Sequence, residues 1–185
     1  MNLPATSKED ILAASREVIK ENGWAAVSIR AVAMRCSVSV GTIYNYYESK
    51  SALLGDTIES VWREIFFHPQ DEHVFHDVAT CVSWIYERLE YGNKQYPGFF
   101  SLHSFGFVKE GKNDGKRRMM QTWEHILNGL CDVLKNDPKI RPDVFDQQFT
   151  EKQFADILFS LMIVSMSRQD YNPSSILMLI NKTLY

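Results

Sequence analysis

The sequence predicts an all-α protein, with an N-terminal three-helix helix-turn-helix domain followed by a C-terminal helical domain, about nine helices in total. Glycine and proline are sparse, at 9 and 6 of 185 residues. No strand-like alternation of apolar and polar residues is sustained, and apolar residues recur at the spacing of one helical face. The composition, 45% hydrophobic and 23% charged, is that of a globular protein able to bury a core.

The predicted domain boundary lies at residues 68–71, because Pro69 cannot continue a helix and the composition changes after it. We therefore expect a first domain over residues 1–50, a connecting helix over about 50–67 and a second domain over 68–185. In the second domain, the apolar periodicity predicts helices over about 73–94, 116–135, 150–168 and from 173 to the C-terminus.

Composition also excludes several classes of function. Lys and Arg total 20 against 23 Asp and Glu, so bulk positive charge does not drive nucleic-acid binding, although a local DNA-binding surface stays open. The polar N-terminus and the lack of an apolar run of about 18 residues predict neither a secretory signal nor a membrane span. Three widely spaced cysteines fit a reducing, cytoplasmic location. Since no P-loop, GxGxxG or nucleophile-elbow motif occurs, we expect no enzyme and no cofactor.

A histidine-rich stretch near the boundary contains residue types that bind metal ions. Its candidate ligands are His68, His73 and His76, with Asp71, Glu72 and Asp77. No cysteine lies nearby and no pair has the spacing of a known zinc motif, so a solvated linker is the favoured interpretation and no metal is predicted.

Residues 28–50 form the most informative stretch, because two short helices joined by a tight turn fit helix-turn-helix geometry. Ser28 and Ser39 are the expected caps, and only Ile43 and Tyr47 of the second helix are suited to the core. The side chains left for its outer surface are Ser39, Val40, Gly41, Thr42, Tyr44, Asn45 and Tyr46. Such a surface suits close approach to phosphates and base edges. A plain three-helix bundle with incidental aromatics is the alternative.

An ordered series of motifs runs through residues 11–54: Asn22-Gly23-Trp24, Val27-Ser28-Ile29, Ala31-Val32-Ala33, Cys36-Ser37-Val38-Ser39, Gly41-Thr42-Ile43-Tyr44-Asn45-Tyr46-Tyr47, and Ser49-Lys50 with Leu53-Leu54. This stretch resembles the N-terminal domain of the TetR family of bacterial transcriptional repressors. One departure is Ser37, which stands where the family usually has glycine. That turn position tends to be left-handed, so a strain of about 1 kcal/mol is expected there.

The resemblance implies a role for each matched residue. Phosphate contacts are implied for Ser28, Thr42, Tyr44 and Lys50. Base contacts are implied for Ser39, Val40, Gly41 and Asn45, with Tyr46 at the edge between backbone and bases. The implied function is a repressor that binds a palindromic DNA operator as a homodimer and is released by a small-molecule effector. The alternative is a helical small-molecule-binding protein, or an enzyme, that retains the helix-turn-helix only as structure.

Aromatic residues concentrate in the second domain, where most of them belong to the core. A more specific hypothesis is that some of them line a cavity for an apolar or planar effector, since ligand pockets are mainly apolar with a few polar groups. The predicted lining is Trp84, Arg88, Phe99, Phe100, His103, Phe107, Gln121, Trp123 and His125.

The last two helices are apolar nearly all round, so both sides of each must be covered. The chain is too short to cover both from within, and a twofold partner that presents the same surface would do so. The predicted dimer interface consists of Phe159, Ile163, Met166, Ile176, Leu177 and Ile180.

Overall fold

The computed structural model describes residues 6–66, 75–100 and 113–185, with only the backbone described for residues 113–122. These residues hold α-helices and one short 3₁₀-helix, η1, and no strand, so the all-α prediction is confirmed. Their bounds are α1 Lys8–Asn22, η1 Trp24–Ala26, α2 Ile29–Arg35, α3 Val40–Tyr44, α4 Lys50–Phe66, α5 Val78–Gln95, α8 Asn113–Asn136, α9 Glu151–Arg168 and α10 Ser174–Leu184. None of the described helices is long and apolar enough to cross a membrane.

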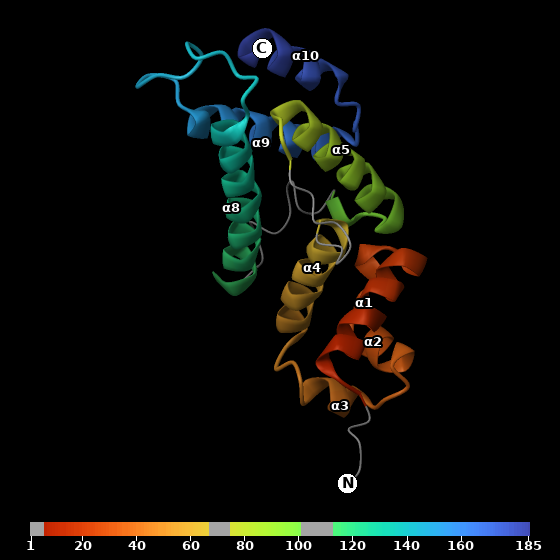
Figure 1. Cartoon of the computed structure of the whole chain (residues 1–185). Helices are drawn as coiled ribbons and strands as arrows, with labels where there is room; N and C mark the ends of the chain where they lie inside the picture. Colours follow the sequence, from red (N-terminus) through yellow and green to blue (C-terminus); the bar gives the residue numbers. More distant parts are fainter. Residues whose placement is uncertain (1–5, 67–74, 101–112) are drawn as a thin grey trace.

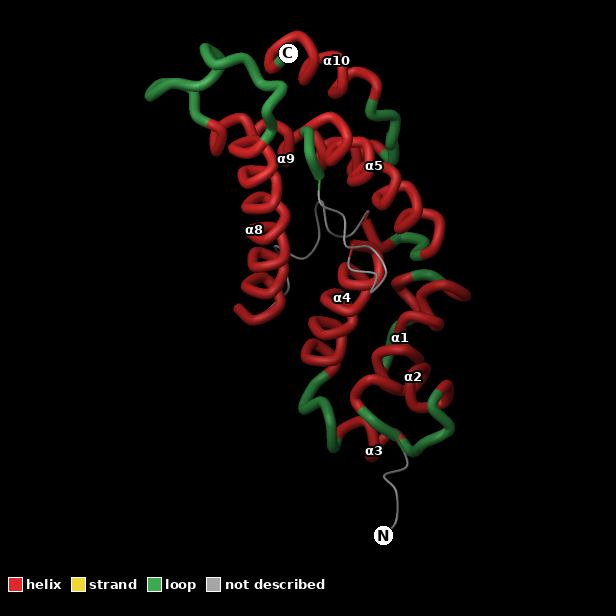
Figure 2. The backbone as a smooth tube through the Cα atoms, in the orientation of Figure 1, coloured by secondary structure: helices red, strands yellow, loops and turns green. Residues whose placement is uncertain are grey.

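The molecule is elongated, and α4 connects its two ends (Figure 1). Helices α1, α2 and α3 gather at the end that carries the N-terminus, whereas α9, α10 and the upper part of α5 form the opposite end. Loops are short within the N-terminal domain, and a longer irregular segment joins α8 to α9 (Figure 2).

The N-terminal domain is built on a small apolar core and on side-chain caps. Ile11, Val32 and Ile43 of α1, α2 and α3 are fully buried, together with Leu53 of the connecting helix α4. Thr6 and Glu9 have the sequence pattern of a capping box, but the box in the structure lies one residue later, at Ser7 and Asp10. The Ser7 hydroxyl accepts from Asp10 N–H at 3.1 Å, and the Asp10 carboxylate accepts from Ser7 N–H at 2.9 Å. Thr6 is buried instead.

Helix starts in the C-terminal domain are also fixed by short-range hydrogen bonds. Asp77 caps α5, which begins at Val78 rather than near residue 73. Thr150 and Gln153 also have the capping-box pattern in the sequence, and they form that box at the start of α9. Asn172 accepts from Ser174 N–H at 3.0 Å, so α10 starts one residue after Pro173.

One buried carboxylate holds three segments of the C-terminal domain together. Asp137 Oδ2 accepts from Val78 N–H at 2.9 Å and from the Tyr185 hydroxyl at 2.6 Å. Its Oδ1 accepts from Lys139 N–H at 2.9 Å. Since a buried charge is stable only when its hydrogen bonds are made, Asp137 anchors the start of α5, the end of α8 and the C-terminus to one another.

An aromatic cluster joins the two domains. Trp62 of α4 lies 5.7 Å from Phe99 and 5.5 Å from Phe100, measured between ring centroids. Trp24 of η1 lies 5.7 Å from Phe99, and Trp24 N–H donates to the Pro97 carbonyl at 3.1 Å. The segment that follows α5 is therefore packed between α4 and the end of α1.

Candidate functional site

The turn between α2 and α3 has the left-handed residue that the resemblance to the TetR family implies. Ser37 has φ of 55°, and its N–H donates to the Met34 carbonyl at 3.1 Å. Val38 N–H donates to the Ala33 carbonyl at 3.0 Å. These two bonds form a Schellman motif, in which the residue after the helix cap takes a left-handed conformation that glycine adopts without strain.

Helix α3 is oriented by one cap and two buried anchors. Ser39 accepts from Thr42 N–H at 3.1 Å, and the two hydroxyl oxygens lie 2.9 Å apart. Ile43 and Tyr47 are 0% and 3% exposed, as expected for the residues that fix the helix to the core. The next helix, α4, is capped by Ser49, which accepts from Ala52 N–H at 3.1 Å.

The structure brings the residues implied to contact DNA to the same end of the molecule, in and beside α3. Ser39, Val40, Gly41, Tyr44, Asn45, Tyr46 and Lys50 are exposed, and Ser28 and Thr42 are half-buried. Tyr44 is the most exposed aromatic of the set, at 51%. Ser28 also caps α2, accepting from Ala31 N–H at 3.1 Å.

Tyr46 has a structural partner that the sequence did not indicate. Its hydroxyl donates to the carbonyl of Thr6, just before α1. This bond connects the end of α3 to the start of α1, so Tyr46 positions α3 in addition to presenting part of its ring at the surface.

The ion pairs between helices of the N-terminal domain join α1 to α4 and α1 to α2. Ion pairs hold α1 and α4 together, with Arg16 at 2.8 Å and Lys20 at 3.0 Å from the Glu64 carboxylate, and Lys8 at 2.6 Å from Asp56. Among the ion pairs of residues 6–66, none involves Lys50. Most acidic residues of α1 and α4 are therefore paired with basic residues away from α3, whereas Lys50 and the acidic Glu48 are both exposed beside α3.

The sequence interpretation did not identify the exposed face of α2, which carries Arg30 and Met34. Arg30 is exposed, and Met34, four residues later on the same side of the helix, is 79% exposed. The spacing of these two residues indicates an exposed face, since positions i and i+4 lie on the same side of a helix. The core positions Ile29, Val32 and Ala33 lie on the other side of α2.

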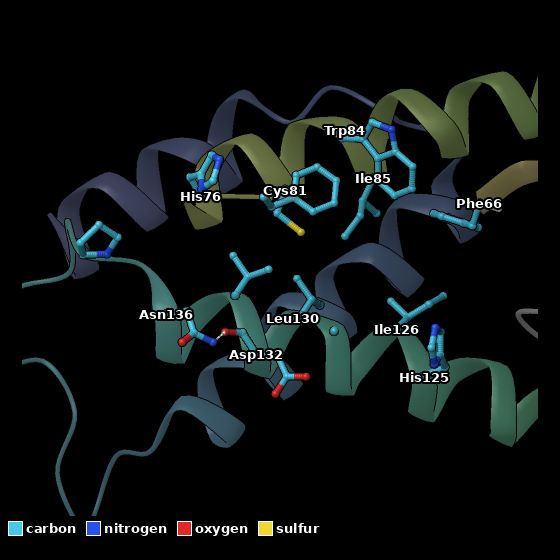
Figure 3. Close-up of a pocket in the computed structure, with 14 residues that line it drawn as sticks. Phe66, His76, Cys81, Trp84, Ile85, His125, Ile126, Leu130, Asp132 and Asn136 are labelled. Atoms are coloured by element: carbon cyan, nitrogen blue, oxygen red, sulfur yellow. Dashed lines mark hydrogen bonds between the residues drawn. The ribbon is translucent and has the colours of Figure 1, made fainter. Parts of the chain in front are cut away.

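A cavity of about 720 Å³ lies between α5 and α8 (Figure 3). Its lining consists of Phe66, Phe75, His76, Cys81, Trp84, Ile85, His125, Ile126, Gly129, Leu130, Asp132, Val133, Asn136 and Pro138. The volume falls in the range of small-molecule sites. Burial raises the pKa of the Cys81 thiol to about 12, so it stays neutral in the wall.

Of the predicted lining residues, the structure places Trp84 and His125 in this cavity. Phe99 and Phe100 belong instead to the aromatic cluster between the domains. Trp123 packs edge-on against Phe159 of α9, at 5.6 Å. His103 and Phe107 lie outside the described residues, as does the side chain of Gln121.

Arg88 also lies outside the described cavity lining, because its guanidinium is used to cap a helix. It donates to the carbonyl of Ile65 and, at 3.2 Å, to that of Glu64, the last carbonyls of α4. A cation at a helix C-terminus satisfies free carbonyls and complements the helix dipole. Arg88 therefore fastens α5 to the end of α4.

The six residues predicted for a dimer interface divide into two groups. Phe159, Ile163, Ile176 and Leu177 are half-buried, whereas Met166 and Ile180 are 2% and 0% exposed within the protomer and are not available to a partner. The exposed apolar side chains of α9 and α10 are Ile157, Val164, Met178 and Leu179, at 39–59%.

The histidine-rich stretch is only partly described. His76 lines the cavity and Asp77 caps α5, whereas His68, Asp71, Glu72 and His73 lie outside the described residues. No group of three or more possible metal ligands occurs in the part of the chain that the structure describes.

Residues 11–57 match the family model of bacterial regulatory proteins, tetR family. The N-terminal domain is a TetR-family domain. It is 43% identical over 44 residues to the HTH-type transcriptional regulator UidR of Escherichia coli K12, a match that covers 24% of this chain and 22% of UidR. The chain thus matches about a fifth of the length of that curated relative.

Similarity to solved structures covers nearly the whole chain. The reduced form of E. coli NemR has a TM-score of 0.65 at 16% identity, covering 96% of this chain and 97% of NemR. The Bacillus subtilis regulator FadR, solved with stearoyl-CoA, has a TM-score of 0.62 at 18% identity, covering 96% and 95%. At these identities the likeness shows the fold.

Proposed function

We propose that this protein is a ligand-responsive transcriptional repressor that binds a palindromic DNA operator as a homodimer. The TetR-type domain supports DNA as the partner, and a cavity of small-molecule size supports an effector. Two structural relatives were solved with small molecules, FadR with stearoyl-CoA and a TetR variant of Acinetobacter baumannii with minocycline. DNA binding would place the protein in the bacterial cytoplasm.

In this proposal, the exposed residues of α3 contact the major groove. Thr42, Tyr44 and Lys50 bind phosphates, helped by Ser28, and the amides at the start of α4 favour the same anions. Val40 and Asn45 contact base edges, with Ser39 and Gly41 close to the bases. Asn45 suits a bidentate contact to adenine, and Val40 suits a thymine methyl group.

The proposal depends mainly on the course of α4, which runs from the DNA-contacting surface to the cavity. Helix α4 begins at Lys50, beside the DNA-contacting surface, and ends at Phe66, which lines the cavity. Arg88 and the aromatic cluster fasten the end of α4 to α5. An effector that displaces Phe66 would therefore tilt α4 and change the spacing of the two recognition helices, which weakens binding to a palindrome.

We propose a second copy of the chain as the occupant of the apolar surface of α9 and α10. Ile157, Val164, Met178 and Leu179 are exposed there, and Phe159, Ile163, Ile176 and Leu177 lie half-buried on the same helices. Twofold symmetry matches the requirement of a palindromic operator, because each half-site then meets one recognition helix.

Selection from random duplexes with the purified protein tests this function. We expect enrichment of a palindrome, with half-sites spaced by about one helical turn or a multiple of it. A protein that enriches no sequence, yet binds small molecules, would instead support the alternative of a binding protein that keeps the helix-turn-helix as structure.

A further inference from the structure

The chemistry of the cavity lining restricts which effector can bind, and this inference rests on the proposed function. The aromatic part of the wall is formed by Trp84 with Phe75 and Phe66, whose ring centroids lie 5.3 Å and 5.8 Å from that of Trp84. Cys81, Ile85 and Leu130 are buried and form the apolar floor. Their side chains point from α5 and α8 toward one another across the cavity (Figure 3). This region suits a flat apolar ring system.

The end of the cavity near the start of α5 is polar and offers acceptors. Asn136 and His76 lie at this end, and Asp132 lies four residues before Asn136 on α8, further along the cavity (Figure 3). The side-chain amide of Asn136 donates to the Asp132 backbone carbonyl at 2.7 Å, which leaves its side-chain oxygen as an acceptor. The carboxylate of Asp132 adds a negative charge at the rim, where it is exposed.

Among the described ion pairs, none involves that carboxylate. Lys139 is held 2.7 Å from Asp77, and Lys135, three residues after Asp132 on α8, is an exposed cation that forms no ion pair with it among the described residues. Asp137 is enclosed by its own donors, including Val78 N–H and the Tyr185 hydroxyl. Among the described lining residues there is no Lys or Arg. An anionic ligand would therefore lose hydration and meet no Lys or Arg among the described lining residues, only the imidazoles of His76 and His125, which is costly in an apolar site.

We propose that the effector is a compact aromatic compound that carries a positively charged or hydrogen-bond-donating group. The ring system packs against Trp84, and the polar group lies at Asp132 and Asn136. Carboxylates and phosphates are disfavoured at this site.

Three naphthalene probes with the same ring test this proposal by isothermal titration calorimetry. They are 1-naphthylmethylamine, a cation at neutral pH, the neutral 1-naphthalenemethanol, and the anion 1-naphthoate. We expect the amine and the alcohol to bind, and the acid to bind at least about tenfold more weakly than the amine.

Two substitutions distinguish the contribution of the Asp132 charge from that of the rest of the cavity. Asp132→Asn should weaken amine binding by about three- to tenfold and change alcohol binding by less than about twofold, since only the amine loses an opposite charge. Asp143→Asn, in the exposed segment after α8, is the matched control and should leave all three affinities unchanged.

Gly129→Leu tests the location of the site. A Cβ at Gly129 meets no atom within 4 Å, so the leucine side chain has room to enter the cavity without unfolding the helix. Binding of every probe should fall, while the thermal unfolding midpoint stays the same or rises.

The proposal is overturned if the acid binds as tightly as the amine, if Asp132→Asn leaves amine binding unchanged, or if no probe binds. These titrations contain no DNA. Their failure would therefore leave the proposed operator binding intact, and a failed duplex selection would leave the ligand class intact.

Discussion

Gly92 of α5 packs directly against Ile65 of α4, because a Cβ atom at Gly92 would lie only 2.6 Å from Cδ1 of Ile65 and 2.9 Å from Cζ of Phe100. Both neighbours are fully buried. The close approach of α5 to the end of α4 therefore depends on the absence of a side chain at Gly92.

Gly92→Ala should destabilise the protein by about 1–3 kcal/mol, because overpacking outweighs the better helix propensity of alanine. It should also lower operator affinity, since the end of α4 must move. Gly55→Ala is the matched control within α4. A Cβ there meets no atom within 4 Å, so it should stabilise by about 0.5–1 kcal/mol. Urea unfolding of both variants measures the difference, and equal stabilities would contradict the packing argument.

Lys50→Ala and Asn45→Ala should have different effects on DNA binding. Loss of Lys50 in both subunits should weaken all duplexes alike and lower the slope of log affinity against log salt by about 2. Asn45→Ala should instead alter the preferred bases, at about 1–3 kcal/mol for a good contact. Salt-dependent titrations and duplex selections measure these effects, with Lys182→Ala of α10 as control. A changed base preference in Lys50→Ala alone would reverse the assigned roles.

Val164→Glu should yield a folded monomer that no longer binds the operator. Val164 is 43% exposed on α9, so the charge is tolerated in the monomer but would be buried without a partner in the dimer. Sedimentation at micromolar concentration measures the state of assembly. Gln147→Glu, in the exposed segment before α9, should remain dimeric. A wild-type protein that sediments as a monomer would refute the dimer.

Ser37→Gly should stabilise the protein by about 1 kcal/mol, because Ser37 has φ of 55° and glycine removes the left-handed strain. Ser39→Gly should give no gain, since Ser39 has φ of −71° and its hydroxyl caps α3. Thermal unfolding of the two variants distinguishes them. A gain of similar size at both positions would indicate a general effect of glycine rather than relief at the turn.

Asp77 should make stability fall in acid. The Lys139 ammonium and Thr80 N–H hold the pKa of Asp77 at about 2, below its ordinary 3.8. A lowered pKa in the folded state gives stability that is present above the ordinary value and is lost as the pH falls through about 4 to 2. Asp77→Ala should cost about 1 kcal/mol at neutral pH through loss of the cap.

Asp77→Asn keeps a capping side chain but removes the charge. Its stability should therefore approach that of the wild type as the pH falls from 4 to 2, which unfolding midpoints across this range would measure. A difference that does not change with pH would show that the ion pair to Lys139 contributes nothing.

The sequence by itself determined the helix-turn-helix and its outer face. Ser28, Ser39 and Ser49 cap the helices that follow them, and Ser37 takes the left-handed conformation. Caps and turns depend on groups two to four residues apart, so they are encoded locally. The exposure of α3 followed similarly, because Ile43 and Tyr47 alone were suited to the core.

Only the tertiary structure decided which apolar residues meet. Phe99 and Phe100 were expected in the cavity but pack against Trp62 between the domains, and Met166 and Ile180 are covered within the protomer rather than exposed to a partner. Helical periodicity identifies the face of a helix that is removed from water. It does not identify what covers that face, because burial of apolar surface is favourable against any apolar neighbour and has no direction.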